Sequence, residues 1–168
     1  MANATTLERS AFETLSRSPV FQHVSEAHLR EIARHCRRRS FAAGEVLMHQ
    51  GDTSDSMDVL VKGKVKVERV FPGADKAVLL ATLQPGDVVG EMGVLAGSPR
   101  SATVTALNPL ETLELKAGFL KKLFMRDTDV LLAIMRIVSK RWKNMDEFVE
   151  MSLQVALNQL VTDGSPAG

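Results

Sequence analysis

A glutamate and an arginine stand on either side of a short glycine-rich segment. Glu91 and Arg100 are nine positions apart, and Gly90, Gly93 and Gly97 punctuate the chain around them. Glycines let bare backbone N–H groups come close to a phosphate. The planar guanidinium of arginine matches phosphate oxygens, and a carboxylate can accept a hydrogen bond from a sugar hydroxyl. The segment therefore predicts a binding site for a phosphate that is joined to a sugar.

The neighbours of this pair complete the predicted site. Arg100 is expected to bind the phosphate, helped by the hydroxyl of Ser101. Backbone N–H groups of Met92, Gly93 and Ser101 can add further donors. Glu91 begins a short helix and is expected to accept a hydrogen bond from a ribose 2′-OH. The competing interpretation is a salt bridge between Glu91 and Arg100 that only holds a loop. The glycines and the hydroxyl after Arg100 favour the ligand site.

Three stretches of different character must position this segment. Residues 1–37 carry two apolar patterns of helical spacing, over 7–15 and 25–36, with Ser25 as the N-cap of the second. Residues 38–116 contain short strand-like runs between glycine and proline turns, which favours a small antiparallel barrel or jelly-roll-like sandwich. These runs cover 45–49, 57–61, 64–70, 77–83, 101–106 and 110–116. Residues 117–163 predict a short helix, a break at 127–129 and a long helix, followed by a disordered tail at 164–168.

The long C-terminal helix carries an apolar stripe with alternating steps of four and three residues. The stripe comprises Leu131, Met135, Val138, Trp142, Met145 and Val149. A helix of about 30 residues is too long to bury such a stripe on a small barrel. We therefore expect part of the stripe to meet a partner helix, from a second copy of the chain or from an effector.

Charge and hydropathy argue against several classes of protein. The net charge of +1 gives no overall attraction for nucleic acid. The basic run of Arg34, Arg37, Arg38 and Arg39 is interpreted as a solvated helix end. No apolar run reaches the roughly 18 residues of a membrane span. We therefore predict no membrane insertion by this chain and a cytoplasmic location, although the chain could also be a piece of a longer membrane protein.

The histidines and the single cysteine argue against catalysis. A metal-dependent barrel enzyme of the cupin type needs a His-x-His pair, and the four histidines stand apart, at His23, His28, His35 and His49. Cys36 falls on the inner face of a predicted helix, which argues against a catalytic Cys–His pair. The chain has neither a P-loop nor a dinucleotide fingerprint. We predict no enzyme activity, no metal and no cofactor.

The segment from Gly90 to Val104 resembles the phosphate-binding cassette of the cyclic nucleotide-binding domain family. This family includes the catabolite activator protein, protein kinase A regulatory subunits and cyclic-nucleotide-regulated channels. Supporting similarities cover roughly residues 15–145 and include Pro19-Val20-Phe21, Ala43-Gly44-Glu45, His49-Gln50-Gly51-Asp52, Val61-Lys62-Gly63-Lys64-Val65 and Pro85-Gly86-Asp87. The resemblance implies an α+β fold. Its eight-strand antiparallel β-roll would span 38–116 with the cassette at 88–104, between N-terminal helices and the hinge and lid helices at 117–163.

The resemblance also implies a ligand, cAMP or cGMP, bound between the cassette and the roll. Arg100 matches the family's phosphate-binding arginine and Glu91 its ribose-binding glutamate, and the pocket is completed by Gly90, Met92, Gly93 and Ser101. Threonine at the position of Ser101 often accompanies cGMP preference in the family, so serine favours cAMP.

The base is expected to contact two strands and the long helix. The strand residues that could line the base side are Val59, Val61, Val78 and Leu80. Trp142 or Met145 could cover the purine, because an aromatic ring or a thioether packs well on a base. Trp142 could instead be a helix–helix contact.

Ligand capture is expected to move the C-terminal helices, with Gly118 and residues 127–129 as hinges. Two alternatives remain open, a scaffold that keeps the fold but binds no nucleotide, and a DNA-binding regulator of the activator-protein type. The second would need a helix-turn-helix after the long helix, for which the 20 residues after Phe148 leave no room.

Overall fold

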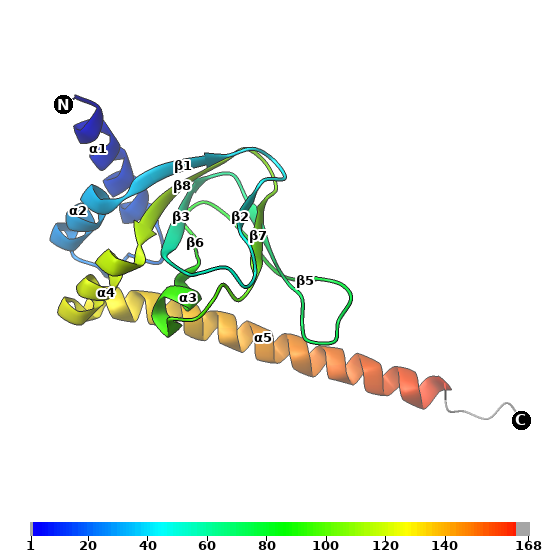
Figure 1. Ribbon diagram of the computed structural model, residues 1–168. Helices are drawn as coiled ribbons and strands as arrows, with labels where there is room; N and C mark the ends of the chain where they lie inside the picture. The colour runs from blue at the N-terminus through cyan, green and yellow to red at the C-terminus, as the bar shows by residue number, and fades with distance from the viewer. Residues whose placement is uncertain (1, 164–168) are drawn as a thin grey trace, which may run out of the picture.

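The computed structural model describes residues 2–163, with the side chains of 6–144, 146, 147 and 150. Within these residues, eight strands form two four-stranded sheets that make a β-roll (Figure 1). All strand pairs are antiparallel. Helices flank the roll and the last of them is long. The predicted α+β class and the helix-flanked β-roll are confirmed.

The two sheets each bring together strands from distant parts of the chain. The first has the order β1 (Arg37–Phe41), β8 (Leu110–Lys116), β3 (Ser56–Lys62) and β6 (Val88–Val89). The second has the order β2 (Val46–Met48), β7 (Thr103–Ala106), β4 (Val65–Arg69) and β5 (Val78–Leu83). Six of these strands fall on the predicted runs, and their ends differ by no more than two residues. β6 is too short to show a strand pattern.

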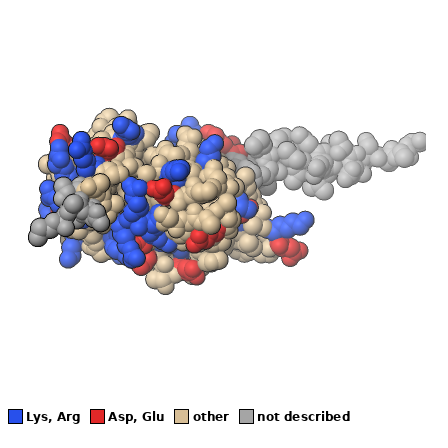
Figure 2. All heavy atoms as spheres, turned by 90° about the horizontal axis from the view of Figure 1, so that it is seen from above, with Lys and Arg blue, Asp and Glu red and all other residues tan. Residues whose placement is uncertain are grey.

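Strand β1 corrects the interpretation of the basic run as a helix end. Residues 37–39 lie in a strand that pairs with β8. Arg38 Nη1 lies 2.7 Å from Glu111 Oε2, and Arg39 Nη1 lies 3.4 Å from Glu114 Oε1. Ion pairs across the strands replace the apolar alternation by which a strand is recognised. Basic side chains are interspersed with acidic ones on the face seen in Figure 2.

The helices cover one end and one side of the roll. They are α1 (Ala2–Arg17), α2 (Glu26–His35), α3 (Glu91–Ala96), α4 (Ala117–Arg126) and α5 (Thr128–Asp163). Figure 1 shows α1, α2 and α4 at one end of the roll, while α5 runs past α3 and extends beyond the sheets. Ser25 caps α2 as predicted, because its Oγ accepts a hydrogen bond from the backbone N–H of His28 at 3.3 Å.

Two clusters of buried apolar side chains stabilise the fold. The first joins α1, α2, α4 and α5 to strands of the first sheet and includes Leu15, Phe21, Ile32, Leu113, Leu120 and Ile134. The second fills the roll and includes Leu60, Val65, Val89, Val104 and Leu110. The two clusters lie on opposite faces of β3 and β8, so these two strands join the helices to the interior of the roll.

The face of α5 that packs against the rest of the fold is not the predicted apolar stripe. Val130 and Ile134 are fully buried, and Ile137 packs against the first cluster. Met135 and Trp142, which belong to the predicted stripe, are 50% and 65% exposed. The buried stripe lies one residue before the predicted one along the sequence. Because α5 is apolar on more than one face, helical periodicity alone could not select the buried face.

The junction between α4 and α5 is attached to α2. One face of α2 provides a close contact between His28 and Asp127, an ion pair of 2.6 Å between Glu31 and Arg126, and a stacked pair of rings, His35 and Phe119, with centroids 3.9 Å apart. Asp127 also begins α5, since its Oδ1 accepts a hydrogen bond from the backbone N–H of Asp129 at 2.9 Å. The break that the sequence predicts at 127–129 falls at Asp127 alone, and Thr128 and Asp129 already belong to α5.

Candidate functional site

Helix α3 and the loop after it form the predicted cassette. Gly90 (φ 87°) and Gly97 (φ 63°) adopt left-handed conformations at the two ends of this helix. A Cβ atom on Gly90 would collide with the guanidinium of Arg100 and lie 2.8 Å from Met48 Cε. Glycine at position 90 therefore permits both the turn into α3 and the close approach of Arg100.

Gly93 packs the cassette against the loop that precedes β3. A Cβ atom on Gly93 would overlap the side chain of Ser54 and lie 3.0 Å from the carbonyl oxygen of Ser98. The hydroxyl of Ser54 is buried there and has no hydrogen-bond partner among the described residues. The cassette backbone thus lies directly on a neighbouring loop.

Arg100 is held in place by the backbone around it. Its Nη1 donates hydrogen bonds to the carbonyl oxygens of Ser56 (2.6 Å) and Gly90 (3.1 Å), and its Nη2 donates to Ser56 Oγ at 3.2 Å. The side chain is only 7% exposed. Burial lowers the pKa of Arg100, whereas Asp58 and Asp55 oppose this shift, and arginine stays charged in proteins. Because a guanidinium has five N–H donors, donors remain for an anion.

Glu91 contacts the long helix rather than Arg100. Its side chain is 1% exposed, and its Oε1 accepts a hydrogen bond from Nη1 of Arg141 in α5. Nη2 of Arg141 donates to the carbonyl oxygen of Val88 in β6. Glu91 Oε2 is buried and has no hydrogen-bond partner among the described residues. Glu91 therefore pairs with Arg141 and does not form the salt bridge with Arg100 that the competing interpretation expects.

Sequence reasoning missed Arg141, although a signal was available. Val130, Ile134, Ile137 and Arg141 are separated by steps of four, three and four residues. A charged residue that continues a buried helical stripe must find a partner in the fold. Knowledge of the buried face of α5 would therefore have pointed to Arg141.

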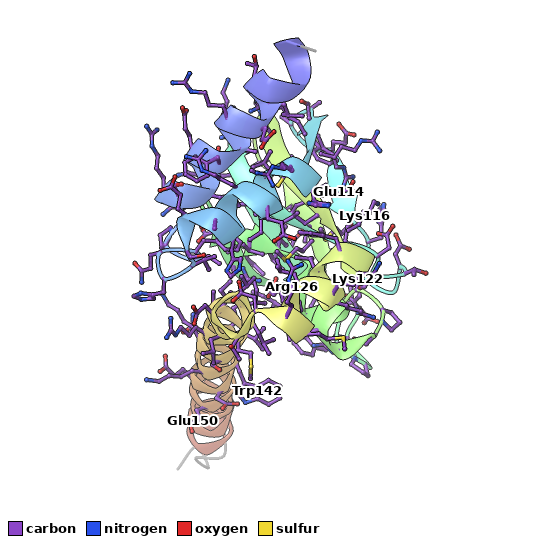
Figure 3. All side chains as sticks on the ribbon, turned by 90° about the vertical axis from the view of Figure 1, so that its left-hand side faces the viewer. Glu114, Lys116, Lys122, Arg126, Trp142 and Glu150 are labelled. Atoms are coloured by element: carbon purple, nitrogen blue, oxygen red, sulfur yellow. The ribbon has the colours of Figure 1, made fainter. Side chains whose placement is uncertain are left out.

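A cavity of about 420 Å³ opens between the cassette, the second sheet and α5. The predicted cassette residues that line it are Gly90, Glu91, Met92, Gly93, Arg100 and Ser101. Val67, Leu80 and Ala81 give it an apolar wall on β4 and β5. Helix α5 closes one side with residues that include Arg141 and Trp142. Trp142 projects from the side of this helix (Figure 3).

The expected base contacts are only partly brought to this cavity. Leu80 and Trp142 line it. Val59 is fully buried in the first apolar cluster, and Val61 packs against the same cluster, so both lie on the helix side of β3. Val78 is not among the described lining residues. The side chain of Met145 lies outside the described residues. The error has a clear cause, because a strand pattern does not tell which of its two faces meets the ligand.

Among the described residues there is neither a metal centre nor a membrane-spanning helix. No group of three or more His, Cys, Asp or Glu side chains among them is placed to hold a metal ion. No helix within residues 2–163 has the length and apolar character needed to cross a membrane.

Comparison with known families identifies the class of protein that this fold and cavity define. The model of the cyclic nucleotide-binding domain matches residues 38–127. These residues contain the cassette, α4 and all of the β-roll except Arg37, which is the first residue of β1. The chain belongs to the cyclic nucleotide-binding domain family.

Relatives of different kinds contain similar domains. A cyclic nucleotide-gated potassium channel of Mesorhizobium japonicum is 37% identical over 100 residues, which cover 60% of this chain and 26% of the channel. A cAMP-dependent protein kinase regulatory subunit of Dictyostelium discoideum is 31% identical over 105 residues, which cover 61% of this chain and 32% of the subunit. The chain thus spans about a quarter to a third of the length of these two curated relatives. A solved cyclic nucleotide-binding domain from Methylobacillus flagellatus has the same fold, with a TM-score of 0.74 at 21% identity, over 88% of this chain and 85% of that one.

Proposed function

We propose that this chain is a regulatory sensor that binds a cyclic nucleotide, prefers cAMP to cGMP and has no catalytic activity of its own. The observation that carries the proposal is that Arg100, Ser101 and Glu91 converge on one cavity. The free donors of Arg100 and the hydroxyl of Ser101 would bind the cyclic phosphate. The unpartnered Oε2 of Glu91 would accept a hydrogen bond from the ribose 2′-OH.

The preference for cAMP is supported by Ser101 and by a relative. Serine replaces the threonine that often accompanies cGMP preference in this family. The Dictyostelium relative is named as a cAMP-dependent regulatory subunit. The purine would pack on Val67, Leu80 and Ala81, with Trp142 as the aromatic cover from α5.

Coupling to the C-terminal helices is supported by the contact between Arg141 and Glu91. The ribose would approach the same carboxyl group that α5 already holds. The nucleotide must therefore share this contact or replace it, and either outcome changes how strongly α5 is attached to the cassette. The ligand can bias the position of α5 only by its different affinity for the two arrangements.

The surface of the chain bears on the partners that we propose. The basic strand β1 is paired with acids and gives no support to a nucleic-acid partner. We propose a cytoplasmic location and a contact of the exposed face of α5 with a second copy of the chain. The exposed apolar residues on this face include Leu132 and Met135.

The test of the proposed function is isothermal titration of the chain with cAMP and with cGMP. The unchanged chain should bind both nucleotides, and cAMP more tightly. Arg100→Gln should lose affinity by about a hundredfold, because charged hydrogen bonds to the phosphate are removed. The matched control is Arg37→Gln, which removes an exposed arginine of β1 that does not line the cavity.

Circular dichroism must show that Arg100→Gln is folded, since Arg100 also holds Ser56 and Gly90. Wild-type affinity in a folded Arg100→Gln variant would contradict the role of Arg100. Absence of heat from both nucleotides with the unchanged chain would favour the alternative, a scaffold that keeps the fold without the ligand.

A further inference from the structure

Asp58 is a fully buried acid on the inner face of the roll. It lies in β3 between Met57 and Val59, which belong to the first apolar cluster, so alternation along the strand directs Asp58 to the opposite face. Leu60, two residues further on, belongs to the cluster that fills the roll. An ionised carboxyl group in such a place is costly unless other groups compensate its charge. The proposed function assigns no role to this carboxyl group.

The neighbours of Asp58 compensate its charge only in part. Thr112 Oγ1 donates a hydrogen bond of 2.6 Å to Asp58 Oδ1, and Arg39 Nη1 lies 3.4 Å from Asp58 Oδ2. The same nitrogen of Arg39 lies 3.4 Å from Oε1 of Glu114, the residue of β8 opposite Asp58. Glu114 also pairs with Lys116 at 3.2 Å, beside which it is labelled in Figure 3. Two acids that face each other across the strands thus share one guanidinium group, and like charges so placed repel.

These surroundings make Asp58 easier to protonate than an exposed aspartate. Burial raises the pKa of its carboxyl group, and the charge of Glu114 acts in the same direction. The hydrogen bond from Thr112 and the charge of Arg39 oppose this rise but do not cancel it. Cys36 lies near enough to sense Asp58, but burial and Asp58 raise the pKa of its thiol to about 12, so Cys36 adds no charge at neutral pH. Asp58 is therefore a buried group that can exchange a proton.

Asp58 lies close to the side chain of Arg100. Ser56, two residues before Asp58 on the same face of β3, accepts hydrogen bonds from both terminal nitrogens of Arg100, at 2.6 and 3.2 Å. Val89, the residue of β6 opposite Asp58, lines the cavity, whereas Asp58 is not among the described lining residues. Burial lowers the pKa of Arg100, and among the charged groups Asp58 opposes this most strongly. Asp58 therefore acts on Arg100 from within the protein.

We propose that Asp58 is a proton-sensitive control on the binding of phosphate by Arg100. This inference rests on the proposed function. The ionised carboxylate compensates the charge of Arg100 and so opposes an anion that approaches Arg100 from the cavity. A proton on Asp58 removes this opposition. Asp55 also approaches Arg100, at 3.9 Å, but it is exposed and pairs with Lys116 at 3.1 Å, so solvent screens its charge.

The sign of the pH dependence follows from linkage. The negative charge of the bound phosphate raises the pKa of Asp58 further, because ligand and proton affect each other's affinity by the same factor. Affinity for cAMP should therefore rise as the pH falls through the pKa that Asp58 has in the complex. It should level off below the pKa that Asp58 has in the free chain. Binding between these two limits takes up protons.

Isothermal titration with cAMP tests this inference on Asp58→Asn, with Glu111→Gln as the matched control. Asparagine keeps an acceptor for the hydroxyl of Thr112 but carries no charge. Glu111→Gln removes the same charge on the other face of β8, where Glu111 pairs with Arg38. At mildly alkaline pH, Asp58→Asn should bind cAMP about fivefold more tightly than the unchanged chain. The difference should vanish in mild acid, where Asp58 is itself protonated, and Glu111→Gln should follow the unchanged chain throughout.

A second variant and a second measurement do not depend on the folding of Asp58→Asn. Thr112→Val removes a hydrogen bond that favours the ionised carboxylate, so the affinity should change at a higher pH than in the unchanged chain. Titrations in buffers of different ionisation enthalpy measure the protons taken up on binding. The unchanged chain and Glu111→Gln should take up protons with cAMP in mild acid, and Asp58→Asn should take up far fewer.

The contrary outcomes separate this inference from the proposed function. Binding of cAMP by the unchanged chain without proton uptake would overturn the inference alone, as would an unmoved pH profile in Thr112→Val. Full uptake in a folded Asp58→Asn variant would assign the proton to another group, such as Glu114, and would overturn it too. Weaker binding by that variant at alkaline pH would show that Asp58 only holds Arg100 in place. Failure of the unchanged chain to bind cAMP would overturn the proposed function, and the inference with it.

Discussion

The carboxyl group of Glu91 has two oxygens in different situations. Oε1 accepts a hydrogen bond from Arg141, while Oε2 is buried and unpartnered among the described residues. If Oε2 receives the ribose 2′-OH, the chain should bind cAMP about tenfold more tightly than 2′-deoxy-cAMP. In Glu91→Gln this gap should shrink, because the charged acceptor is gone.

The control for this prediction is Glu68→Gln, on β4 but not among the described residues that line the cavity, which should keep the gap between the two nucleotides. Competition titrations with cAMP and 2′-deoxy-cAMP measure the gap in each protein. A gap of the same size in Glu91→Gln would show that another group receives the 2′-OH.

At this scale the sequence predicted the residues whose chemistry is local. Glu91 and Arg100 belong to one segment of ten residues, and the glycines around them mark it. Arg141 could not be recognised in the same way, because it reaches the cavity through the packing of a distant helix. Val59 was misplaced for the related reason that strand alternation leaves the choice of face open.

At the scale of elements, the attachment of α2 to the α4–α5 junction contains a titratable ion pair. The hydrogen bond from Arg126 lowers the pKa of Glu31, and burial opposes this only in part. A carboxyl group with a lowered folded-state pKa contributes stability above its unfolded pKa, and this is lost as the pH falls through the folded-state pKa. Glu31→Gln should therefore be less stable than the unchanged chain at pH 7, and the difference should vanish in acid.

Urea unfolding of both proteins between pH 7 and acid measures this difference. It should be small and should shrink in high salt, because Arg126 is exposed. A difference in unfolding free energy that does not change with pH would mean that Glu31 acts by packing rather than by charge.

The sequence pattern did not predict strand β1 or the buried face of α5. Strand β1 was hidden because its residues are mostly arginines, which find acids across the sheet instead of an apolar face. The buried face of α5 was missed by one residue, because the helix has apolar residues on both the covered and the exposed side. The other strands were found because glycine and proline turns bound them clearly.

At the scale of the whole molecule, α5 extends beyond the roll (Figure 1). Leu132 and Met135, on the described part of this helix, are apolar and exposed. Sedimentation equilibrium should detect a dimer of the chain, and Met135→Glu should shift it toward monomer by placing a charge in the contact. Lys122→Glu, on α4, should leave the equilibrium unchanged. A monomer at all accessible concentrations would contradict contact with a second copy.

The central claim is that nucleotide capture at the cassette is transmitted to α5. Amide hydrogen exchange of the whole chain, with and without saturating cAMP, tests both parts in one measurement. We predict slower exchange over residues 90–102 and a changed rate over residues 130–144, where Arg141 joins the helix to Glu91. Protection of the cassette with no change in α5 would contradict the coupling, and unchanged exchange in both segments would contradict the claim as a whole.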